Sequence, residues 1–581
     1  MKLLSKISAE KTLLVLFTIA SGTFFCFFYD NHLYQREQLQ MFQLTFSYLI
    51  ERLSVQGGFA IYFGEFFTQF FGIPLAGAAI ISMFLVFLQM ATRKLLFTIS
   101  GNKNLEILSF LPAVGYWILL TQQFYYLSGL IGLLISVLAS VFYLGIKRDK
   151  RRILSGILLI PLLYWLTGGA FLVFTLNIII PVLSTGKRSD RSLFSKFSIP
   201  LLYILLASLI PVITRNFLIT DSLLQSYLSG AYYAISIFFP VPLIVVFLVI
   251  PSLILLQSLL PLSDKQSSLL SIVSVILVAT INIAGIKLFA GFKEEKEMAY
   301  DNLVYDQNWD GVIRLAENEQ PASRRSMVAV NLALARTGQL STKMFRFDQD
   351  ENSLFLDYER RGMTPFIANE PFYYLGLINF SQMFAMESIE STPDAKIPVR
   401  AFKRVAETYY INDQYDVAGR YFYRIGHTLF YNKWAEKFLE LNSREAVERR
   451  KLKPKDDFFY NGQQMDIALR YLLIANPENR MAYEYLMAHY LLKKDFDGFL
   501  KAINMVKSMK YDTLPVVFQE AIAYILTIVP EMPAQLQNLT PDKAVTDRIR
   551  DYARLYSEDR EDTAGMKKEF GDTYWYYLHF K

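Results

Sequence analysis

The first half of the sequence alternates long apolar runs with short basic clusters, and this alternation restricts the fold more than any other feature. As a helix, an uncharged run of roughly 20 residues spans the hydrocarbon core of a bilayer. We count about nine such runs before residue 290. Their approximate positions are 12–28, 73–92, 104–121, 125–145, 153–167, 169–184, 197–214, 235–260 and 268–289. Residues 1–290 are therefore expected to form a polytopic bundle of transmembrane helices.

The first run, residues 12–28, permits two interpretations. Ala20-Ser21-Gly22 is a weak cleavage pattern, so the run resembles a secretory signal. However, bulky aromatic residues follow this pattern in place of a polar mature segment, and several further spans come after it. We expect an uncleaved first span.

The basic clusters predict how the bundle is oriented. With the N-terminus inside, Arg93–Lys94 and the clusters at 147–152 and 186–191 all fall on the cytoplasmic side, as the positive-inside rule requires. An odd number of spans then places residues 291–581 on the outer face, which in a bacterial inner membrane is the periplasm. The formal net charge of +6 lies largely in these loops, so no nucleic-acid partner is expected.

Motifs for the common cofactor-dependent and hydrolytic chemistries are absent. The single cysteine, Cys26, excludes a disulfide within the chain, and four histidines are too few and too dispersed to favour a His-based metal site. The sequence has no phosphate-binding loop, no nucleophile elbow and no H-E-x-x-H motif. We therefore predict neither a cofactor nor a metal ion.

Residues 291–581 have the charge density of a soluble domain and are almost entirely helical in pattern. The segments 327–345, 404–425 and 476–503 each read as a helix, a polar turn and a second amphipathic helix, which resembles tetratricopeptide repeats. Another type of helical solenoid remains an alternative. Either arrangement exposes a concave surface that binds a partner protein.

The first outer loop, residues 29–72, carries two amphipathic patterns. Leu39, Phe42, Phe46, Leu49 and Leu53 recur at helical spacing, which predicts a helix in the membrane interface.

The second pattern in this loop is a small and polar stripe formed by Gly58, Tyr62, Glu65, Gln69 and Gly72. A carboxylate in an aromatic helix is costly unless it faces a polar cavity, a partner or headgroups, so Glu65 is a candidate for a functional site. Alternatively, the helix lies in the interface and Glu65 reaches water.

Asp30 directly follows the first span, and Arg36 lies two turns further on. A second outer loop, residues 215–232, contributes Arg215 and Asp221. These residues and Glu65 are the candidate site residues. The simpler alternative is that each polar side chain anchors its loop among headgroups.

This layout resembles the GT-C class of membrane glycosyltransferases. The resemblance implies that Asp30, with Glu65, is catalytic and acts as general base toward an acceptor. It also implies that Arg36, Arg215 and Asp221 bind a sugar carried on polyprenyl phosphate. The first loop has Tyr29-Asp30-Asn31 where some members carry a D-x-D motif, so no metal ion is implied.

The segment "QLTFSYLIERLSVQGGFAIYFGEFFTQFFGIPLAGA", residues 43–78, is similar to an uncharacterised family of Bacteroides-type polytopic membrane proteins. That resemblance extends over the whole chain and implies no activity. The sequence therefore leaves two hypotheses: an inner-membrane glycosyltransferase for envelope glycans, or a non-catalytic scaffold whose helical repeats bind envelope proteins.

Overall fold

The structure is a computed structural model in which all regular structure is helical. It describes residues 9–100, 106–184, 193–218, 222–228, 232–234, 239–259, 264–357, 364–439, 444–454 and 464–581. Within these ranges no strand is present, and the only pairing of extended backbone is an isolated antiparallel bridge between Tyr125 and Tyr233. The prediction of an all-α protein is confirmed.

The chain divides into two compact units. Unit 1 comprises Met1–Glu295 together with two short segments from the second half of the sequence, Pro393–Ile397 and His427–Phe430. Unit 2 comprises Lys296–Thr392, Pro398–Gly426 and Tyr431–Lys581. Because two loops of the second half belong to unit 1, the two units are not separated by one boundary in the sequence.

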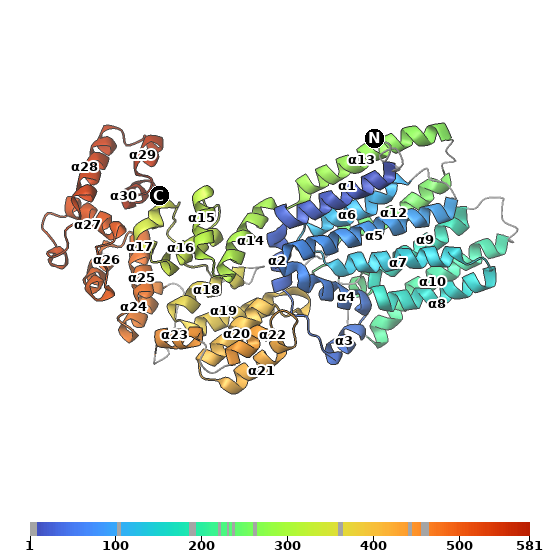
Figure 1. Cartoon of the computed structure of the whole chain (residues 1–581), viewed down its shortest axis with the longest axis horizontal. Coiled ribbons are helices and arrows are strands. Elements are labelled where there is room, and N and C mark those ends of the chain that lie inside the picture. The colour runs from blue at the N-terminus through green and yellow to red at the C-terminus, as the bar shows by residue number, and fades with distance from the viewer. Residues whose placement is uncertain are drawn as a thin grey trace, which may run out of the picture. The chain divides into compact units, whose positions relative to one another are not determined.

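Unit 1 is a bundle of long apolar helices with three short helices, α2, α3 and α4, at one end (Figure 1). Its helices are α1 (Ala9–Thr23), α2 (Asp30–Gln38), α3 (Phe46–Leu53), α4 (Gly58–Thr68), α5 (Pro74–Ser100), α6 (Leu111–Leu120), α7 (Leu127–Gly145), α8 (Asp149–Thr167), α9 (Phe171–Ser184), α10 (Leu193–Phe217), α11 (Leu223–Tyr227), α12 (Val241–Leu259) and α13 (Asp264–Phe289). A π-helical turn, Phe24–Phe28, extends α1, and 3-10 turns Gln69–Gly72, Ile107–Phe110 and Gly168–Ala170 precede α5, α6 and α9.

Seven helical segments among the described residues are long and apolar enough to cross a membrane. One of them, Asp149–Ser184, contains two of the predicted spans, α8 and α9, which are joined by a turn at Gly168 with φ of 61°. Both helices pack against α7 and α10. The predicted span 104–121 appears as a shorter apolar helix, Ile107–Leu120. The structure thus supports insertion in a membrane, whereas the count of nine spans stays a prediction.

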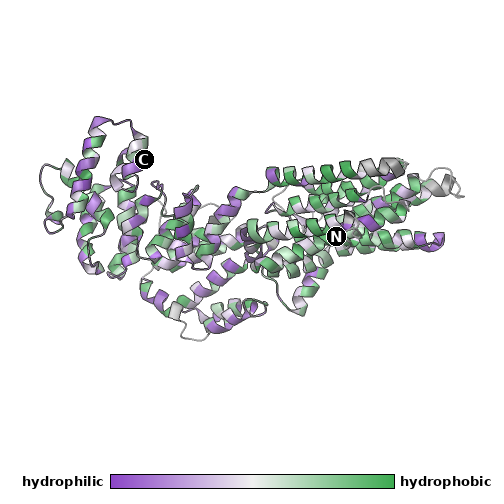
Figure 2. Cartoon of the chain, turned by 45° about the horizontal axis from the view of Figure 1, so that its top comes forward, coloured by the Kyte–Doolittle hydropathy of each residue, from purple (hydrophilic) through white to green (hydrophobic). Residues whose placement is uncertain are grey.

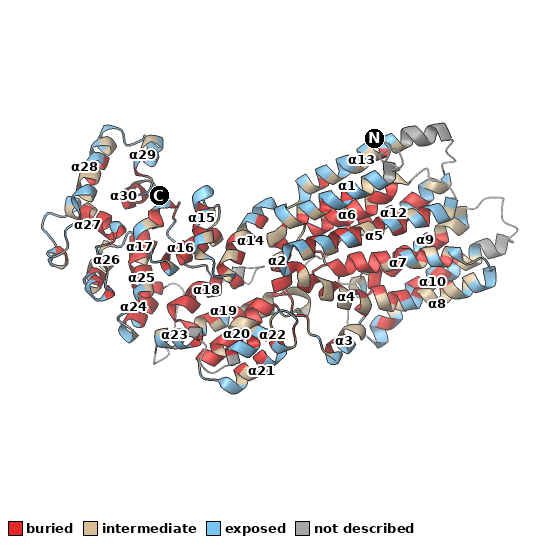
Figure 3. Cartoon of the chain, in the orientation of Figure 1, coloured by how far each residue is buried: buried red, intermediate tan, exposed pale blue. Residues whose placement is uncertain are grey.

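The outer surface of the bundle is apolar, as a lipid-facing surface must be. Large side chains on the long helices are exposed although they are hydrophobic, and in a soluble protein such a contiguous surface would promote aggregation. Figures 2 and 3 show these helices as largely hydrophobic with exposed outer faces. Examples are Phe87, Leu158, Leu201, Leu248, Ile276 and Ile283.

Unit 2 is built from shorter amphipathic helices. They are α14 (Phe292–Tyr305, which begins in unit 1), α15 (Trp309–Asn318), α16 (Arg324–Arg336), α17 (Leu340–Lys343), α18 (Thr364–Leu375), α19 (Ile378–Ser391), α20 (Val399–Ile411), α21 (Tyr415–Gly426), α22 (Asn432–Leu439), α23 (Arg444–Leu452), α24 (Met465–Ala475), α25 (Arg480–Leu492), α26 (Phe496–Ile503), α27 (Val516–Ile528), α28 (Lys543–Glu558), α29 (Thr563–Phe570) and α30 (Tyr574–Phe580). One hydrophobic core runs from α14 to α27 and includes side chains of α30.

Five turns between successive helices of unit 2 share the same backbone motif. Each has one residue with positive φ, and the next N–H donates to a carbonyl five residues back at 2.6–2.9 Å, as in a Schellman motif. The three predicted helix–turn–helix segments each contain one of these turns. The residues with positive φ are Gln307, Gly338, Gly376, Asp413 and Lys494.

Candidate functional site

The connection between α1 and α5 folds as α2, α3 and α4 at one end of the unit 1 bundle. The predicted interfacial helix is shorter than expected, because α3 begins only at Phe46. Thr45 caps it by accepting the Tyr48 N–H at 3.2 Å, and the Leu44 N–H donates to the carbonyl of His427 at 2.8 Å. The backbone before Phe46 is therefore extended and is paired with a distant segment.

Glu65 lies on α4 and is buried, as the polar stripe of that helix suggested. Its Oε2 accepts hydrogen bonds from the Tyr48 hydroxyl and from Arg52 Nε, each at 2.8 Å. Gln40 donates to the backbone carbonyl of Glu65 at 2.7 Å. Gly64 lets this helix approach α7 closely, since a Cβ there would lie 2.8 Å from Ser128. Glu65 therefore faces protein and an arginine, not water.

Arg36, in the last turn of α2, is buried without a counter-ion. Its Nη2 donates to the carbonyl of Gln122, whereas Nε and Nη1 are buried and have no hydrogen-bond partner. No carboxylate pairs with this guanidinium within the described ranges. Burial lowers the pKa of Arg36 to about 10, which still leaves it charged at neutral pH. A desolvated cation with two unused donors is costly unless an anion binds it.

A second cation reaches the same region from the segment Pro393–Ile397. Lys396 Nζ lies 3.3 Å from the centroid of the Tyr126 ring, and the Tyr126 hydroxyl donates to Asp394 Oδ2 at 2.8 Å. Burial lowers the pKa of Lys396; Glu65 and Asp394 oppose that shift, and Arg36 adds to it. Asp394 has φ of 64°, a backbone conformation that costs free energy in a non-glycine residue.

Tyr126 is positioned by backbone pairing just before α7. Its N–H donates to the carbonyl of Tyr232 at 2.9 Å, and the N–H of Ala234 donates to the carbonyl of Phe124 at 2.8 Å. We refer to the group gathered around this tyrosine as the polar cluster. Its members are Arg36, Tyr48, Arg52, Glu65, Tyr126, Asp394 and Lys396.

The polar cluster contains three cations and two carboxylates. Arg52 is paired with Glu65, and Lys396 lies among Glu65, Asp394 and Tyr126. Arg36 is the cation that these acids do not pair with, so the surplus positive charge is located at its guanidinium. Chemically, the cluster can bind an anion at Arg36 and offer Glu65 as a hydrogen-bond acceptor.

Asp30 lies at the opposite end of α2 from Arg36 and is half-buried. Glu295 accepts the N–H groups of Asn31 and His32 at 2.8 and 2.9 Å and so caps this helix end. Burial raises the pKa of Glu295 to about 7, and the charge of Asp30 adds to the shift. The structure therefore places Asp30 beside Glu295, whereas Glu65 is paired with Arg52.

The second outer loop adds little to this geometry. Arg215 is exposed in the last turn of α10, a helix that packs against α8, α9 and α11. Asp221 lies outside the described residues. Among the described residues no group of three or more histidine, cysteine, aspartate or glutamate side chains has the arrangement of a metal site.

Comparison with protein families places the whole chain in one group. Residues 5–581 match the model described as "Family of unknown function (DUF6057)". The chain belongs to this family. It matches no curated protein and no solved structure. The resemblance to an uncharacterised membrane protein family is confirmed in this form, and the likeness to glycosyltransferases and to tetratricopeptide repeats receives no support from the comparisons.

For this member of the family, the sequence pattern singled out Arg36 and Glu65 but not Tyr126, Asp394 and Lys396, which the structure places in the same cluster. Tyr126 sits in a short apolar-flanked turn, and the other two lie some 270 residues away in a loop of the second half. The sequence contains only a weak indication that Asp394 and Lys396 belong to a site: in the loop "TPDAKIP", these two charged residues lie between two prolines. Nothing local connects this loop with α2 or α4.

Proposed function

We propose that this protein binds the phosphate of a lipid-linked sugar at the polar cluster and transfers the sugar to an acceptor, in the manner of GT-C enzymes. The observation that carries the proposal is the buried Arg36 guanidinium: among the described residues, its Nε and Nη1 have no hydrogen-bond partner and no carboxylate pairs with it. Arginine suits phosphate because its planar fork donates parallel hydrogen bonds to two oxygens. Lys396 supplies a second positive charge nearby.

The surroundings of the polar cluster support a lipid as the carrier of that phosphate. The helix α2 follows α1 directly, so Arg36 is close in sequence to the end of the first apolar segment. On α3, Phe46 and Ile50 are exposed, as is Leu44 just before it. Exposed apolar side chains beside a short amphipathic helix are typical of a membrane interface. A bound phosphate at Arg36 would then leave its lipid chain near the bilayer.

The proposed transfer assigns the proton step to Glu65. Oε2 accepts both hydrogen bonds to this carboxylate, and Oε1 accepts none from the described residues. The acceptor hydroxyl gives its proton to Glu65 while its oxygen bonds to the anomeric carbon. The bond from that carbon to the phosphate oxygen breaks, and the lipid phosphate leaves bound to Arg36. A positioned base of this kind contributes about 10²–10⁴ in rate.

The topology belongs to the same proposal. We propose an inner-membrane protein with nine spans, a cytoplasmic N-terminus and a periplasmic second half that binds a protein partner through tetratricopeptide-like repeats. The basic cluster at 147–152 supports it, because α7 separates that cluster from the α2–α4 end of the bundle. The turn residues 307, 338, 376 and 413 recur at intervals close to a 34-residue repeat. Reporter fusions after Arg152 and at Lys581 test the orientation, with outer-face signal expected only at Lys581.

Binding is tested with the full chain in detergent and two probes, a polyprenyl phosphate and the matching polyprenol. The wild type should prefer the phosphate, and Arg36→Met should weaken phosphate binding by about 10- to 100-fold, the equivalent of a charged hydrogen bond. Arg36→Lys should retain part of the affinity, and Arg215→Met serves as an exposed control. Equal affinity for both probes, or unchanged binding by Arg36→Met, would overturn the proposal.

Catalysis is tested by complementation of a deletion strain and by transfer assays. Glu65→Gln should abolish transfer, while Tyr48→Phe removes a hydrogen bond to the same oxygen and keeps the charge, which controls for local structure. Asp30→Asn is assayed in parallel, and loss there alone would move the base to Asp30. If Arg36→Met, Glu65→Gln and Asp30→Asn all behave as wild type, transfer is rejected and the scaffold function remains.

A further inference from the structure

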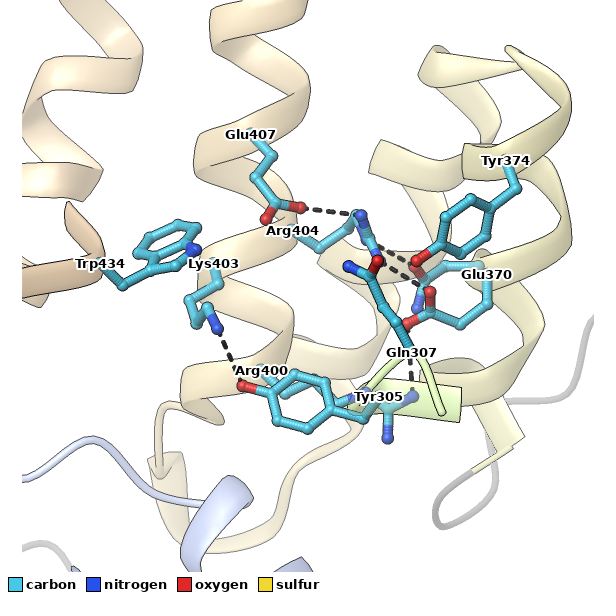
Figure 4. A pocket seen from close by; sticks show the side chains of 10 residues that line it. Tyr305, Gln307, Glu370, Tyr374, Arg400, Lys403, Arg404, Glu407 and Trp434 are labelled. Carbon is cyan, nitrogen blue, oxygen red and sulfur yellow. Dashed lines mark hydrogen bonds and ion pairs between the residues drawn. The ribbon is translucent and has the colours of Figure 1, made fainter. Parts of the chain in front are cut away.

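Unit 2 contains a cavity of about 250 Å³ that no part of the proposed function uses. Figure 4 shows its lining, with Trp434 and Lys403 on one side and Glu370 and Tyr374 on the other. The side chains come from α14, α18, α20 and α22 and from the turn after α14. They are Tyr305, Gln307, Asn369, Glu370, Tyr374, Arg400, Lys403, Arg404, Glu407 and Trp434.

Two of the three cations in this cavity are each paired with two carboxylates. Arg400 pairs with Asp301 at 2.8 Å and with Glu370 at 3.3 Å. Arg404 pairs with Glu370 at 2.7 Å and with Glu407 at 2.8 Å. All five side chains are largely buried, so these pairs fix the wall of the cavity and leave the arginines no surplus charge.

Lys403 is the exception, because no carboxylate pairs with it among the described residues. Its Nζ donates to the Tyr305 hydroxyl at 3.0 Å and is surrounded by aromatic rings, with centroids of Tyr305, Tyr431 and Trp434 at 5.0, 5.1 and 4.6 Å. An ammonium group has three donors, and only one is used here. Within the described residues that line the cavity, Lys403 is thus the cation without an ion-paired carboxylate, although Glu407 is near enough to act on its charge.

We infer that this cavity binds a small anionic sugar, with its acidic group on Lys403. The volume is slightly below the range of typical ligand pockets, which limits the ligand to about one ring. Trp434 and Tyr305 offer apolar faces to that ring, while Glu370, Glu407 and Asn369 place oxygen atoms where hydroxyl groups can donate. The inference does not rest on the polar cluster of unit 1.

The acidic group of the sugar is either a carboxylate or a phosphate. Both accept hydrogen bonds from an ammonium group, so the shared requirement is a negative charge next to a hydroxyl-rich ring. Glucuronate and glucose 1-phosphate represent the two sources. Glucose tests whether an uncharged sugar ring is sufficient for binding, and inorganic phosphate tests whether a negative charge without a sugar ring is sufficient.

The test measures binding of these four probes to the full chain in detergent by calorimetry. One or both acidic sugars should bind at least about tenfold more tightly than glucose and than inorganic phosphate. Lys403→Met should reduce that binding by about tenfold or more. Lys433→Met is the matched control, because Lys433 is an exposed lysine next to Trp434 on α22. It should bind as the wild type does.

The wild type alone provides a second measurement, in case Lys403→Met does not fold. The preference of the wild type for an acidic sugar over both glucose and inorganic phosphate requires no variant, and it should be at least about tenfold in each comparison. The inference is overturned if glucose binds as tightly as the acidic sugars, if none of the probes binds, or if a folded Lys403→Met keeps full affinity.

Discussion

Buried arginines occur in both units, but they are compensated in different ways. In unit 2, Arg400 and Arg404 are held by Asp301, Glu370 and Glu407 in a closed set of ion pairs. In unit 1, Arg36 is also buried, and its hydrogen-bond partner within the described part of the chain is the backbone carbonyl of Gln122. The arginines of unit 2 are balanced by carboxylates, whereas none of the described carboxylates pairs with Arg36.

This contrast separates structural charges from functional ones. A buried ion pair adds little net stability, yet removing one partner leaves the other charge buried alone. Conversely, removing a charge that already lacks a partner relieves a cost. The sign of the change in unfolding free energy therefore distinguishes an arginine that the fold requires from one that the fold tolerates.

The largest effect is expected for Arg400→Met. This substitution removes the cation that pairs with the buried Asp301 and leaves Glu370 with Arg404 alone, so the free energy of unfolding should fall by about 3–5 kcal/mol. Denaturant unfolding followed by tryptophan fluorescence measures it. Arg470→Met, which breaks an exposed pair with Asp466, should change stability by less than about 1 kcal/mol. If Arg400→Met changes stability by less than about 1 kcal/mol, buried arginines in the two units do not differ in their contribution to stability.

The next effect concerns pH and the buried carboxyl of Glu295. Its pKa of about 7 lies above the ordinary value of 4.5, so the folded state holds this proton more tightly than the unfolded state. The stabilisation is therefore complete below pH 4.5 and is lost as pH rises through 7. That loss amounts to about 3 kcal/mol.

The matched variants for this prediction are Glu295→Gln and Glu294→Gln. The first should flatten the stability profile between pH 4.5 and 7, and the second, at an exposed neighbour, should leave it unchanged. Stability is measured by unfolding the full chain in detergent across that pH range. A sloping profile in Glu295→Gln would show that another group causes the dependence.

Arg36→Met should have a smaller effect than either of these and the opposite sign from Arg400→Met. Because the guanidinium has no carboxylate partner, its removal should leave stability unchanged or raise it by about 1–2 kcal/mol. Thermal unfolding without added lipid measures it. A loss of several kcal/mol of stability would show that Arg36 already interacts with an anion in the folded protein. Arg36 would then be a charge that the fold requires.

The last and smallest effects are expected for two glycine substitutions, which change no charge and so provide a reference for the charge-removing variants. Gly338 has φ of 70°, and an added Cβ would be in ordinary van der Waals contact with Arg480 Nη2 at 3.8 Å, so Gly338→Ala should cost about 1–2 kcal/mol from backbone strain. Gly419 lies in α21 with open space and no positive φ, so Gly419→Ala should add about 0.5–1 kcal/mol. Destabilisation by Gly419→Ala would contradict the open space at that position, and stabilisation by Gly338→Ala would contradict the strain at Gly338.

Local patterns allowed much of the fold to be predicted. The stripe on α4, the long apolar helices and the helix–turn–helix segments at Gly338, Asp413 and Lys494 depend on periodicity within about 20 residues, which a sequence displays directly. The helical class followed for the same reason.

Non-local contacts set the limits of that prediction. The helix expected from Leu39 begins only at Phe46, because the preceding backbone bonds to the carbonyl of His427. Likewise, Arg36 and Glu65 could be chosen as polar residues in an apolar context, but no pattern connects them with Lys396. Lys403 was missed because its environment is made by rings from α14 and α22.

The inclusion of Pro393–Ile397 in unit 1 has a consequence for biogenesis. Ribosomes extend a chain at about 5–20 residues per second, and Tyr126 and Asp394 are 268 positions apart. Tyr126 is thus synthesised about 13–54 s before Asp394, and the last apolar helix, α13, about 5–20 s before it. During that interval the nascent chain holds only part of the polar cluster. The polar cluster is therefore completed only after residue 396 has been synthesised, and a chain truncated before residue 393 lacks both Asp394 and Lys396.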